Sequence, residues 1–120
     1  MITENTAQHI GTEWVNDWNS HDLDKVMSHY SDDIHFTSPF VIKINNDPTG
    51  VINSKPALRV YFERALNAYP DLHFELYCIL SSVNSIVVYY KSVNNLFAAE
   101  LMELNEEGKV VKVVAHYCSQ

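Results

Sequence analysis

The apolar residues of this chain change their spacing at Pro70. Before Pro70 they recur every three or four residues, as in amphipathic helices, and after it they alternate with polar residues, as in strands. Helices that precede an antiparallel sheet, rather than alternating with its strands, indicate the α+β class. Because long sheets twist, we expect a single domain over residues 1–120, in which a curved antiparallel sheet wraps around three N-terminal helices as a cone-shaped half-barrel.

Local signals predict where the elements of the first half begin and end. Side chains that cap helix N-termini mark three helix starts, at Asn5 or Thr6, at Asp22 and at Ser54. The third start is strengthened by Pro56, because proline is tolerated in the first turn of a helix. Between the second and third helices we expect a strand over residues 34–38, stopped by Pro39, and then mostly loop over residues 40–53.

The second half is expected to form strands joined by tight turns. The strands are predicted over residues 72–80, 85–93, 96–104 and 109–118. Asn94 and Asn95 are interpreted as a two-residue turn, because asparagine accepts a positive φ, and this turn places Tyr89 opposite Glu100. One face of the predicted sheet then carries Val87, Tyr89, Ala98, Glu100, Met102, Val111, Val113, Ala115 and Tyr117.

The opposite face of the predicted sheet is also substantially apolar, with Tyr90, Leu101 and Val114 among its residues. A sheet with one face in water alternates cleanly between apolar and polar residues, which this one does not. One face must pack on the helices, so the other requires a partner. The simplest partner is a second copy of the chain, and we expect a homodimer joined through the outer face of the sheet.

Glu100 is the chemically unusual residue of the predicted inner face. A turn over residues 105–108 places its carboxyl group opposite Val113, on an apolar wall. Burial raises the pKa of such a group by up to about 3–5 units, and the neutral acid is a hydrogen-bond donor. With Tyr89 as a second donor, the pair could hold an oxyanion or polarise a carbonyl. Alternatively, Glu100 lies near the rim, where it reaches water or pairs with Lys91.

Aromatic side chains are expected to crowd the gap between helices and sheet. If these side chains fill the gap completely, they are ordinary core residues with no separate function. If the half-barrel is open at one end, a subset of them lines a ligand cavity. Tyrosine and tryptophan are favoured as lining, because their polar tips require a partner when buried. The candidate lining residues are Trp14, Trp18, Tyr30, Phe36, Tyr61, Phe62, Val87, Met102, Val113, Ala115 and Tyr117.

Composition argues against several classes of function. A net charge of −7 disfavours binding to nucleic acid or to anionic membrane surfaces. The chain has no apolar run long enough to span a bilayer, no signal peptide and two distant cysteines, so a cytoplasmic protein with free thiols is expected. Its six histidines lack the spacing of metal ligands and its three glycines form no phosphate loop, so we expect no metal and no cofactor.

The chain resembles the SnoaL-like proteins over nearly its whole length. The segments that carry the resemblance run from Trp14 to Asp24, from Tyr30 to Ile34, from Phe36 to Pro39, from Lys55 to Phe62, from Pro70 to Phe74 and from Gly108 to Val111. These proteins belong to the superfamily of nuclear transport factor two, ketosteroid isomerase, scytalone dehydratase and the polyketide cyclases. The resemblance implies a cystatin-like α+β roll, a fold that hosts enzymes and non-enzymes alike.

The resemblance implies no specific activity. The general-base aspartate of ketosteroid isomerases falls on Ser38, their oxyanion-hole tyrosine on Trp14 and their protonated aspartate on Glu100. The acid and the histidine of the cyclases fall on Ala115 and Val113. By this resemblance, the chain lacks both the general base of the isomerases and the acid and histidine of the cyclases.

Three hypotheses follow. In the first, the protein binds a small hydrophobic or aromatic molecule in its pocket, with no assignable activity. In the second, it is an enzyme of the isomerase, cyclase or dehydratase type, with Glu100 as acid or base on a carbonyl compound. Tyr89 and Trp14 then act as donors, and Ser38 as an orienting group. In the third, the protein is a non-catalytic, dimeric interaction module.

Overall fold

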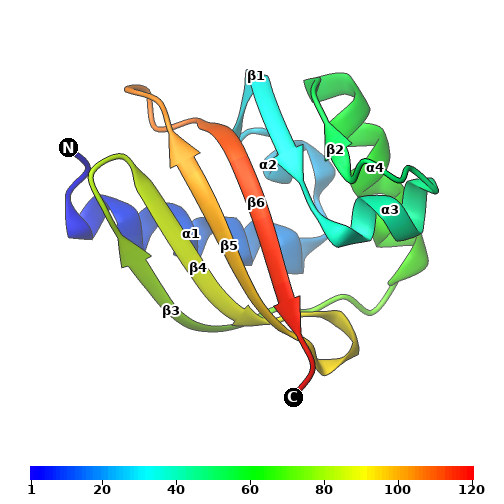
Figure 1. The fold of residues 1–120 in the computed structure, drawn as a ribbon. Coiled ribbons are helices and arrows are strands. Elements are labelled where there is room, and N and C mark those ends of the chain that lie inside the picture. The colour runs from blue at the N-terminus through cyan, green and yellow to red at the C-terminus, as the bar shows by residue number, and fades with distance from the viewer.

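The computed structural model describes all 120 residues and shows one curved, open sheet with helices packed against it (Figure 1). The helices are α1 (Glu4–Ser20), α2 (Leu23–Met27), α3 (Pro39–Asn45) and α4 (Lys55–Ala68), and η1 (Val93–Asn95) is a short 3-10 turn. The strands are β1 (Tyr30–Thr37), β2 (Val51–Ile52), β3 (Glu75–Ser81), β4 (Ser85–Lys91), β5 (Phe97–Leu104) and β6 (Val110–Cys118). The α+β class expected from sequence is confirmed.

The six strands lie in the order β2-β1-β6-β5-β4-β3. Strands β3 to β6 form the expected antiparallel meander. The sheet is not antiparallel throughout, because β1 runs parallel to β6 and joins the first half of the chain to its last strand. Helix α1 lies across β3 and β4, and α4 lies against β1 (Figure 1).

Helix α1 approaches the sheet closely at Gly11. A Cβ atom at this position would lie 2.5 Å from Cδ1 of Ile79 on β3. That separation is well below van der Waals contact, so a larger residue here would require Ile79 or the helix to move. The aromatic residues Trp14 and Trp18 are on the same helix, and both are buried in the core between helices and sheet.

Capping side chains begin the helices. The expected caps of α2 and α4 are confirmed: Asp22 accepts a hydrogen bond from the backbone of Lys25, and Ser54 caps α4. Helix α1 begins earlier than expected, because Thr3 is its cap. The difference of two or three residues arises because neighbouring polar residues can each serve as a cap.

The segment from residue 40 to residue 53, expected to be mostly loop, begins with helix α3. Ser38 caps this helix by accepting a hydrogen bond from the backbone N–H of Phe40 at 3.2 Å, and Pro39 occupies its first turn. The same Ser-then-Pro signal that predicts α4 is present here. Pro39 was interpreted only as the end of a strand, although its fixed φ also suits the start of a helix.

The turn between β4 and β5 is one residue longer than expected. Asn94 and Asn95 do take positive φ values, of 57° and 58°. The backbone N–H of Ser92, however, donates to the carbonyl of Leu96 at 2.8 Å, so three residues form the loop instead of two. As a result Glu100 pairs with Val88 and not with Tyr89.

This one-residue difference reverses both faces of β4, because side chains alternate along a strand. Tyr90 points inward, and Tyr89 and Val87 point outward. The register of β5 with β6 also differs from expectation, since Glu100 lies opposite Ala115 and Met102 opposite Val113. That difference is two residues, so Val113, Ala115 and Tyr117 stay on the inner face as expected. A register shift between Glu103 and Leu104 breaks the alternation at the start of β6, so Val110 is buried in place of the expected Val111.

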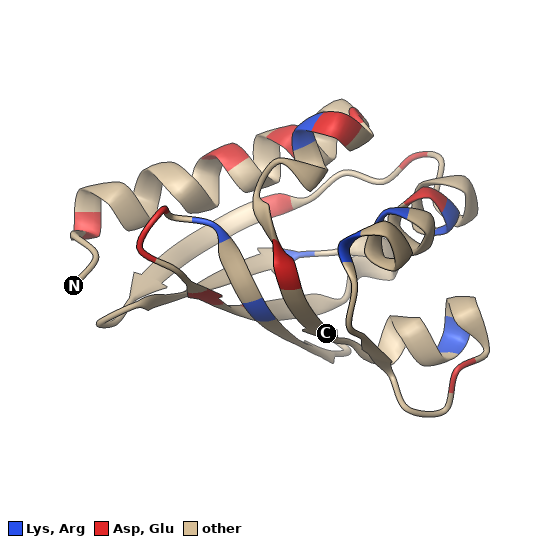
Figure 2. Cartoon of the chain, turned by 90° about the horizontal axis from the view of Figure 1, so that it is seen from above, with Lys and Arg blue, Asp and Glu red and all other residues tan.

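Acidic residues dominate the charged surface. Figure 2 shows Asp and Glu along α1 and α2 and in the loop between β5 and β6. The net charge of −7 reflects this distribution. None of the helices has the length and apolar character that crossing a bilayer requires.

Candidate functional site

A cavity of about 50 Å³ lies between the helices and the inner face of the sheet. Most of its wall is aromatic: Trp14 and Trp18 come from α1, Tyr30 and Phe36 from β1, and Tyr61 and Phe62 from α4. The wall contains one ionisable acid, Glu100, contributed by the central strand β5. The volume is enough for a few water molecules, at roughly 10–15 Å³ each.

Glu100 is 5% exposed, and the hydroxyl of Tyr90 donates a hydrogen bond to its Oε1 atom. Burial raises the pKa of Glu100 to about 7, although the hydrogen bond from Tyr90 acts in the opposite direction. A substantial fraction of Glu100 is therefore neutral near physiological pH. The alternative of an ion pair with Lys91 is wrong, because Lys91 pairs with Glu75 at 3.0 Å.

Four tyrosines surround the Glu100 carboxyl group. Burial is the largest cause of a raised pKa in each of them, and the negative charge of Glu100 raises each pKa further. All four phenols are neutral at physiological pH and can donate hydrogen bonds. The four are Tyr30, Tyr61, Tyr90 and Tyr117.

The two indole N–H groups at the back of the cavity differ in their partners. Trp14 Nε1 donates to the hydroxyl of Tyr30 at 2.9 Å. Trp18 Nε1 is buried and makes no hydrogen bond of normal geometry, although it lies close enough to Tyr30 to act on the pKa of its hydroxyl. A buried donor without a partner costs about 1–3 kcal/mol. At this point of the cavity wall the chain itself supplies no well-placed acceptor for the N–H group.

Half-buried aromatic rings close the cavity on the side of α3. The ring of Phe40 packs edge-on against Tyr117, with centroids 4.8 Å apart, and against Tyr69, with centroids 6.0 Å apart. Lys43 Nζ contacts the hydroxyl of Tyr69 at 3.2 Å from the outside. These side chains form the aromatic mouth of the cavity, defined here as Phe40, Tyr69 and Tyr117.

A family model described as a SnoaL-like domain matches residues 12–118. The chain belongs to the SnoaL-like family. No curated protein sequence matches it.

Solved structures agree with this membership. A SnoaL-like protein of unknown function from Burkholderia thailandensis is 36% identical, covers 98% of both chains and superposes with a TM-score of 0.94. A putative isomerase of the SnoaL-like family from Agrobacterium tumefaciens is 14% identical over 96% of this chain and 99% of that one, with a TM-score of 0.77. SalBIII, an epoxide hydrolase/cyclase-like enzyme in pyran ring formation in salinomycin, is 18% identical over 98% of this chain and 95% of that one, with a TM-score of 0.77. The last two likenesses show the fold alone, and no specific activity is assignable from them.

The SnoaL-like fold brings most of the sequence-predicted pocket residues onto the cavity wall. Those that line it are Trp14, Trp18, Tyr30, Phe36, Tyr61, Phe62, Glu100 and Tyr117. Met102, Val113 and Ala115 face inward and are buried, but they lie in packed core outside the wall. Ser38 is 2% exposed and caps α3, and its side chain partly offsets the burial that raises the pKa of Tyr61 and Tyr117.

Two predicted site residues lie on the wrong side of the SnoaL-like sheet. Tyr89 is on the outer face, where its ring centroid is 5.0 Å from that of Tyr77, and Val87 is on the same face. The longer hairpin loop is the physical reason. Trp14, expected as a free donor, is already bonded to Tyr30.

Several wall residues were missed from the sequence. They are Phe40, Ile44, Ala65, Tyr69, Leu72, Phe74, Tyr90, Ser92 and Val93. Tyr90 would have been found with the correct hairpin loop, and Phe40 and Ile44 with the helix start at Ser38. Ala65 continues the buried stripe of α4, so helical spacing could have found it. The remaining five come from segments at element ends, where no local pattern indicates which way a side chain points.

Proposed function

We propose that this SnoaL-like protein binds a small, largely apolar molecule that carries one hydrogen-bond acceptor, such as a ketone. The observation that carries the proposal is Glu100, a buried carboxyl group with a pKa of about 7 on an otherwise aromatic cavity wall. The hydroxyl of Tyr90 donates a hydrogen bond to Oε1 of this carboxyl group. When Glu100 is protonated on Oε2, that proton can be donated to an oxygen atom of a ligand.

The geometry also limits the size of the ligand. A cavity of about 50 Å³ is far smaller than the roughly 300–1,000 Å³ of drug-sized ligand sites. A molecule larger than a few heavy atoms therefore enters only if the aromatic mouth rotates outward. The half-buried ring of Phe40, between Tyr69 and Tyr117, is the part of the wall with room to do so.

Isosteric pairs of ligands test the proposal. Cyclohexanone and methylenecyclohexane differ only in C=O against C=CH₂, as do acetophenone and α-methylstyrene. We expect the ketones to raise the melting temperature more than the alkenes, and the preference to fall as pH rises through about 7, because the donating proton is lost. Glu100→Leu should remove the preference while leaving alkene binding intact. Equal shifts for ketone and alkene in the wild-type protein would contradict the proposal.

A second candidate function is proton transfer on a carbonyl compound. It is favoured by the pKa of Glu100, because a general acid or base works best when its pKa lies near the operating pH. Tyr90 takes the role that sequence assigned to Tyr89, and Ser38 remains an orienting group through Tyr61. In this case Glu100→Gln keeps the fold but abolishes turnover of any substrate found. Retained turnover would exclude Glu100 as the acid or base.

We also propose that two copies pair through the outer face of the sheet. Support comes from an aromatic cluster on that face: Tyr77, Tyr89 and Phe97 have ring centroids 5.0–6.1 Å apart. Leu80 and Leu101 lie nearby on β3 and β5, exposed by 54% and 36%. An apolar surface of this kind on a sheet is typical of an interface.

The remaining expectations from composition are proposals as well. We propose a cytoplasmic location, supported by the exposed, free thiols of Cys78 and Cys118, which persist in reducing compartments. The net charge of −7 supports a partner other than nucleic acid or an anionic membrane.

A further inference from the structure

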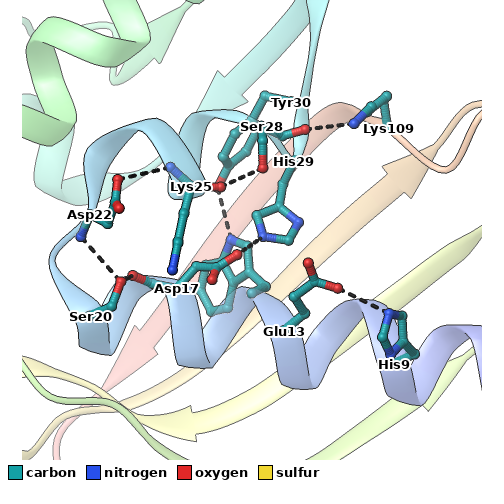
Figure 3. Close-up of polar contacts among 11 residues, drawn as sticks. His9, Glu13, Asp17, Ser20, Asp22, Lys25, Ser28, His29, Tyr30 and Lys109 are labelled. Carbon is teal, nitrogen blue, oxygen red and sulfur yellow. Dashed lines mark hydrogen bonds and ion pairs between the residues drawn. The ribbon is translucent and has the colours of Figure 1, made fainter.

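Three side chains able to bind a metal converge outside the cavity, where α1 meets the junction of α2 and β1 (Figure 3). Glu13 and Asp17 are one turn apart on α1, and His29 precedes β1. One ligand atom from each lies within 4.8 Å of the others. No metal site was expected from sequence, because the histidines lack ligand spacing, but here a single histidine joins two carboxylates through the fold.

The distances suit a zinc ion after small side-chain movements. Zinc bonds to nitrogen and oxygen are about 2.0–2.2 Å long, so neighbouring ligands in a tetrahedral site are roughly 3.4 Å apart. His29 Nε2 lies 2.7 Å from Asp17 Oδ2, slightly closer than that spacing. A ligand atom of Glu13 lies within 4.8 Å of both, and its side chain is 51% exposed and so has room to adjust.

Two of the three ligands are already held in place. The side chains of His29 and Asp17 are only 11% and 16% exposed. The backbone of His29 is fixed at both ends, since its carbonyl accepts from Val110 N at 2.8 Å and its N–H donates to Val26 at 3.3 Å. Ligands held in this way lose little side-chain freedom when a metal binds.

The chemistry of the set favours zinc over calcium or magnesium. An imidazole nitrogen is a common zinc ligand, whereas calcium and magnesium prefer oxygen alone. Two carboxylates also offset the charge of a divalent ion. His9 Nε2 lies 3.0 Å from Glu13 Oε2, in an exposed pair one turn apart on α1.

We propose that Glu13, Asp17 and His29 bind one zinc ion, with water completing its coordination. The ion ties α1 to the start of β1. Trp14 and Tyr30 follow Glu13 and His29 directly in sequence and are hydrogen-bonded at 2.9 Å, so the ion also braces the back wall of the cavity. This site is independent of the ligand proposed for the cavity.

Isothermal titration of the metal-free, tag-free protein with zinc chloride tests the site. We expect saturable binding of one ion per chain and a higher melting temperature with zinc. His29→Ala and Glu13→Gln should each weaken binding by more than about tenfold. Glu13 is half-exposed, so its variant keeps the fold even if His29→Ala does not. His73→Ala, an exposed histidine far from the cluster in sequence, is the matched control.

Cobalt(II) supplies a second readout, because a tetrahedral nitrogen and oxygen site gives it strong visible absorption bands that Glu13→Gln should remove. The proposal is overturned if the wild-type protein shows no saturable zinc binding. It is equally overturned if folded Glu13→Gln binds zinc as tightly as the wild type and His73→Ala do. In that case the contact between His29 and Asp17 is only a hydrogen bond that joins α1 to the start of β1.

Discussion

The hydroxyl of Tyr90 donates a hydrogen bond to the carboxyl group of Glu100 on the neighbouring strand. Val88 is the residue directly opposite Glu100, and Tyr90 is its diagonal neighbour. Diagonal positions on adjacent strands are about 7–8 Å apart, which a tyrosine side chain can bridge. The bond thus depends on strand register, and it supplies the buried acid with a partner inside the cavity.

The first prediction concerns the pH dependence of stability. The pKa of Glu100 is about 7 in the folded protein and 4.5 in an ordinary environment. Between these values the folded protein holds a proton that the unfolded chain has released, so the free energy of unfolding falls as pH rises and the loss is complete above pH 7. At about 1.36 kcal/mol per pKa unit, the loss is roughly 3 kcal/mol.

Glu100→Gln isolates this effect, because the amide cannot ionise. Urea unfolding of both proteins at about pH 5 and about pH 8 should show the wild type losing roughly 2.5 kcal/mol relative to the variant. Parallel pH profiles for the two proteins would mean that Glu100 is ionised and solvated in the folded state.

The second prediction concerns the partner of Glu100. Tyr90→Phe removes the hydrogen bond that lowers the Glu100 pKa, so that pKa should rise above its present value of about 7. The free energy of unfolding should fall by roughly 1–3 kcal/mol, since a buried acceptor loses its donor. NMR titration of ¹³C-labelled glutamate carboxyl groups measures the pKa.

Tyr89→Phe is the matched control for this change. Tyr89 lies on the outer face against Tyr77, so removing its hydroxyl should leave the Glu100 titration where it was. If Tyr89→Phe shifts the titration and Tyr90→Phe does not, the hairpin register derived from sequence holds and the present one is wrong.

The third prediction concerns the aromatic mouth. Phe40→Ala removes the ring between Tyr69 and Tyr117 and should expose the cavity to small solutes. The protein has two tryptophans, Trp14 and Trp18, and both line the cavity. Acrylamide should therefore quench the fluorescence of the variant more strongly than that of the wild type. The ring is half-buried, so the stability cost should be roughly 2 kcal/mol.

Ile42→Ala on the same helix serves as the reference, because Ile42 is 47% exposed and does not line the cavity. Its quenching should match that of the wild type. Unchanged quenching in Phe40→Ala would show that Phe40 does not limit access to the cavity.

The fourth prediction concerns the proposed dimer. Leu101→Glu places a charge on the outer face, at a side chain that is 36% exposed, and should convert a dimer into a monomer in sedimentation experiments at micromolar concentration. Val60→Glu makes the same change on α4, at a side chain that is 50% exposed, and should leave the dimer intact. A wild-type protein that sediments as a monomer would refute the interface.

Local signals were sufficient for much of the fold. Asp22 and Ser54 cap helices because a side-chain oxygen next to an apolar run satisfies backbone N–H groups wherever it occurs. The signal at Ser38 was equally local but was obscured by Pro39, which fits both the end of a strand and the start of a helix. The inward position of Glu100 was one of two alternatives that the sequence left open, and its burial in the structure decides between them.

The cluster of Glu13, Asp17 and His29, proposed above to bind zinc, shows the opposite case. Glu13 and Asp17 share a helix face by their spacing, but nothing in the sequence brings His29 to them. That contact depends on how the α2–β1 junction packs on α1, which is a long-range property of the fold.

By itself the sequence determined the starts of α2 and α4, the change of period at Pro70 and the membership of the SnoaL-like family. Only the tertiary structure decided that Tyr90, and not Tyr89, meets Glu100. The physical reason is that hairpin loops of two and three residues differ little in local energy, yet one extra residue reverses every side chain of a strand. The size of the cavity was likewise decided by how its aromatic rings pack against one another, and no single residue specifies that arrangement.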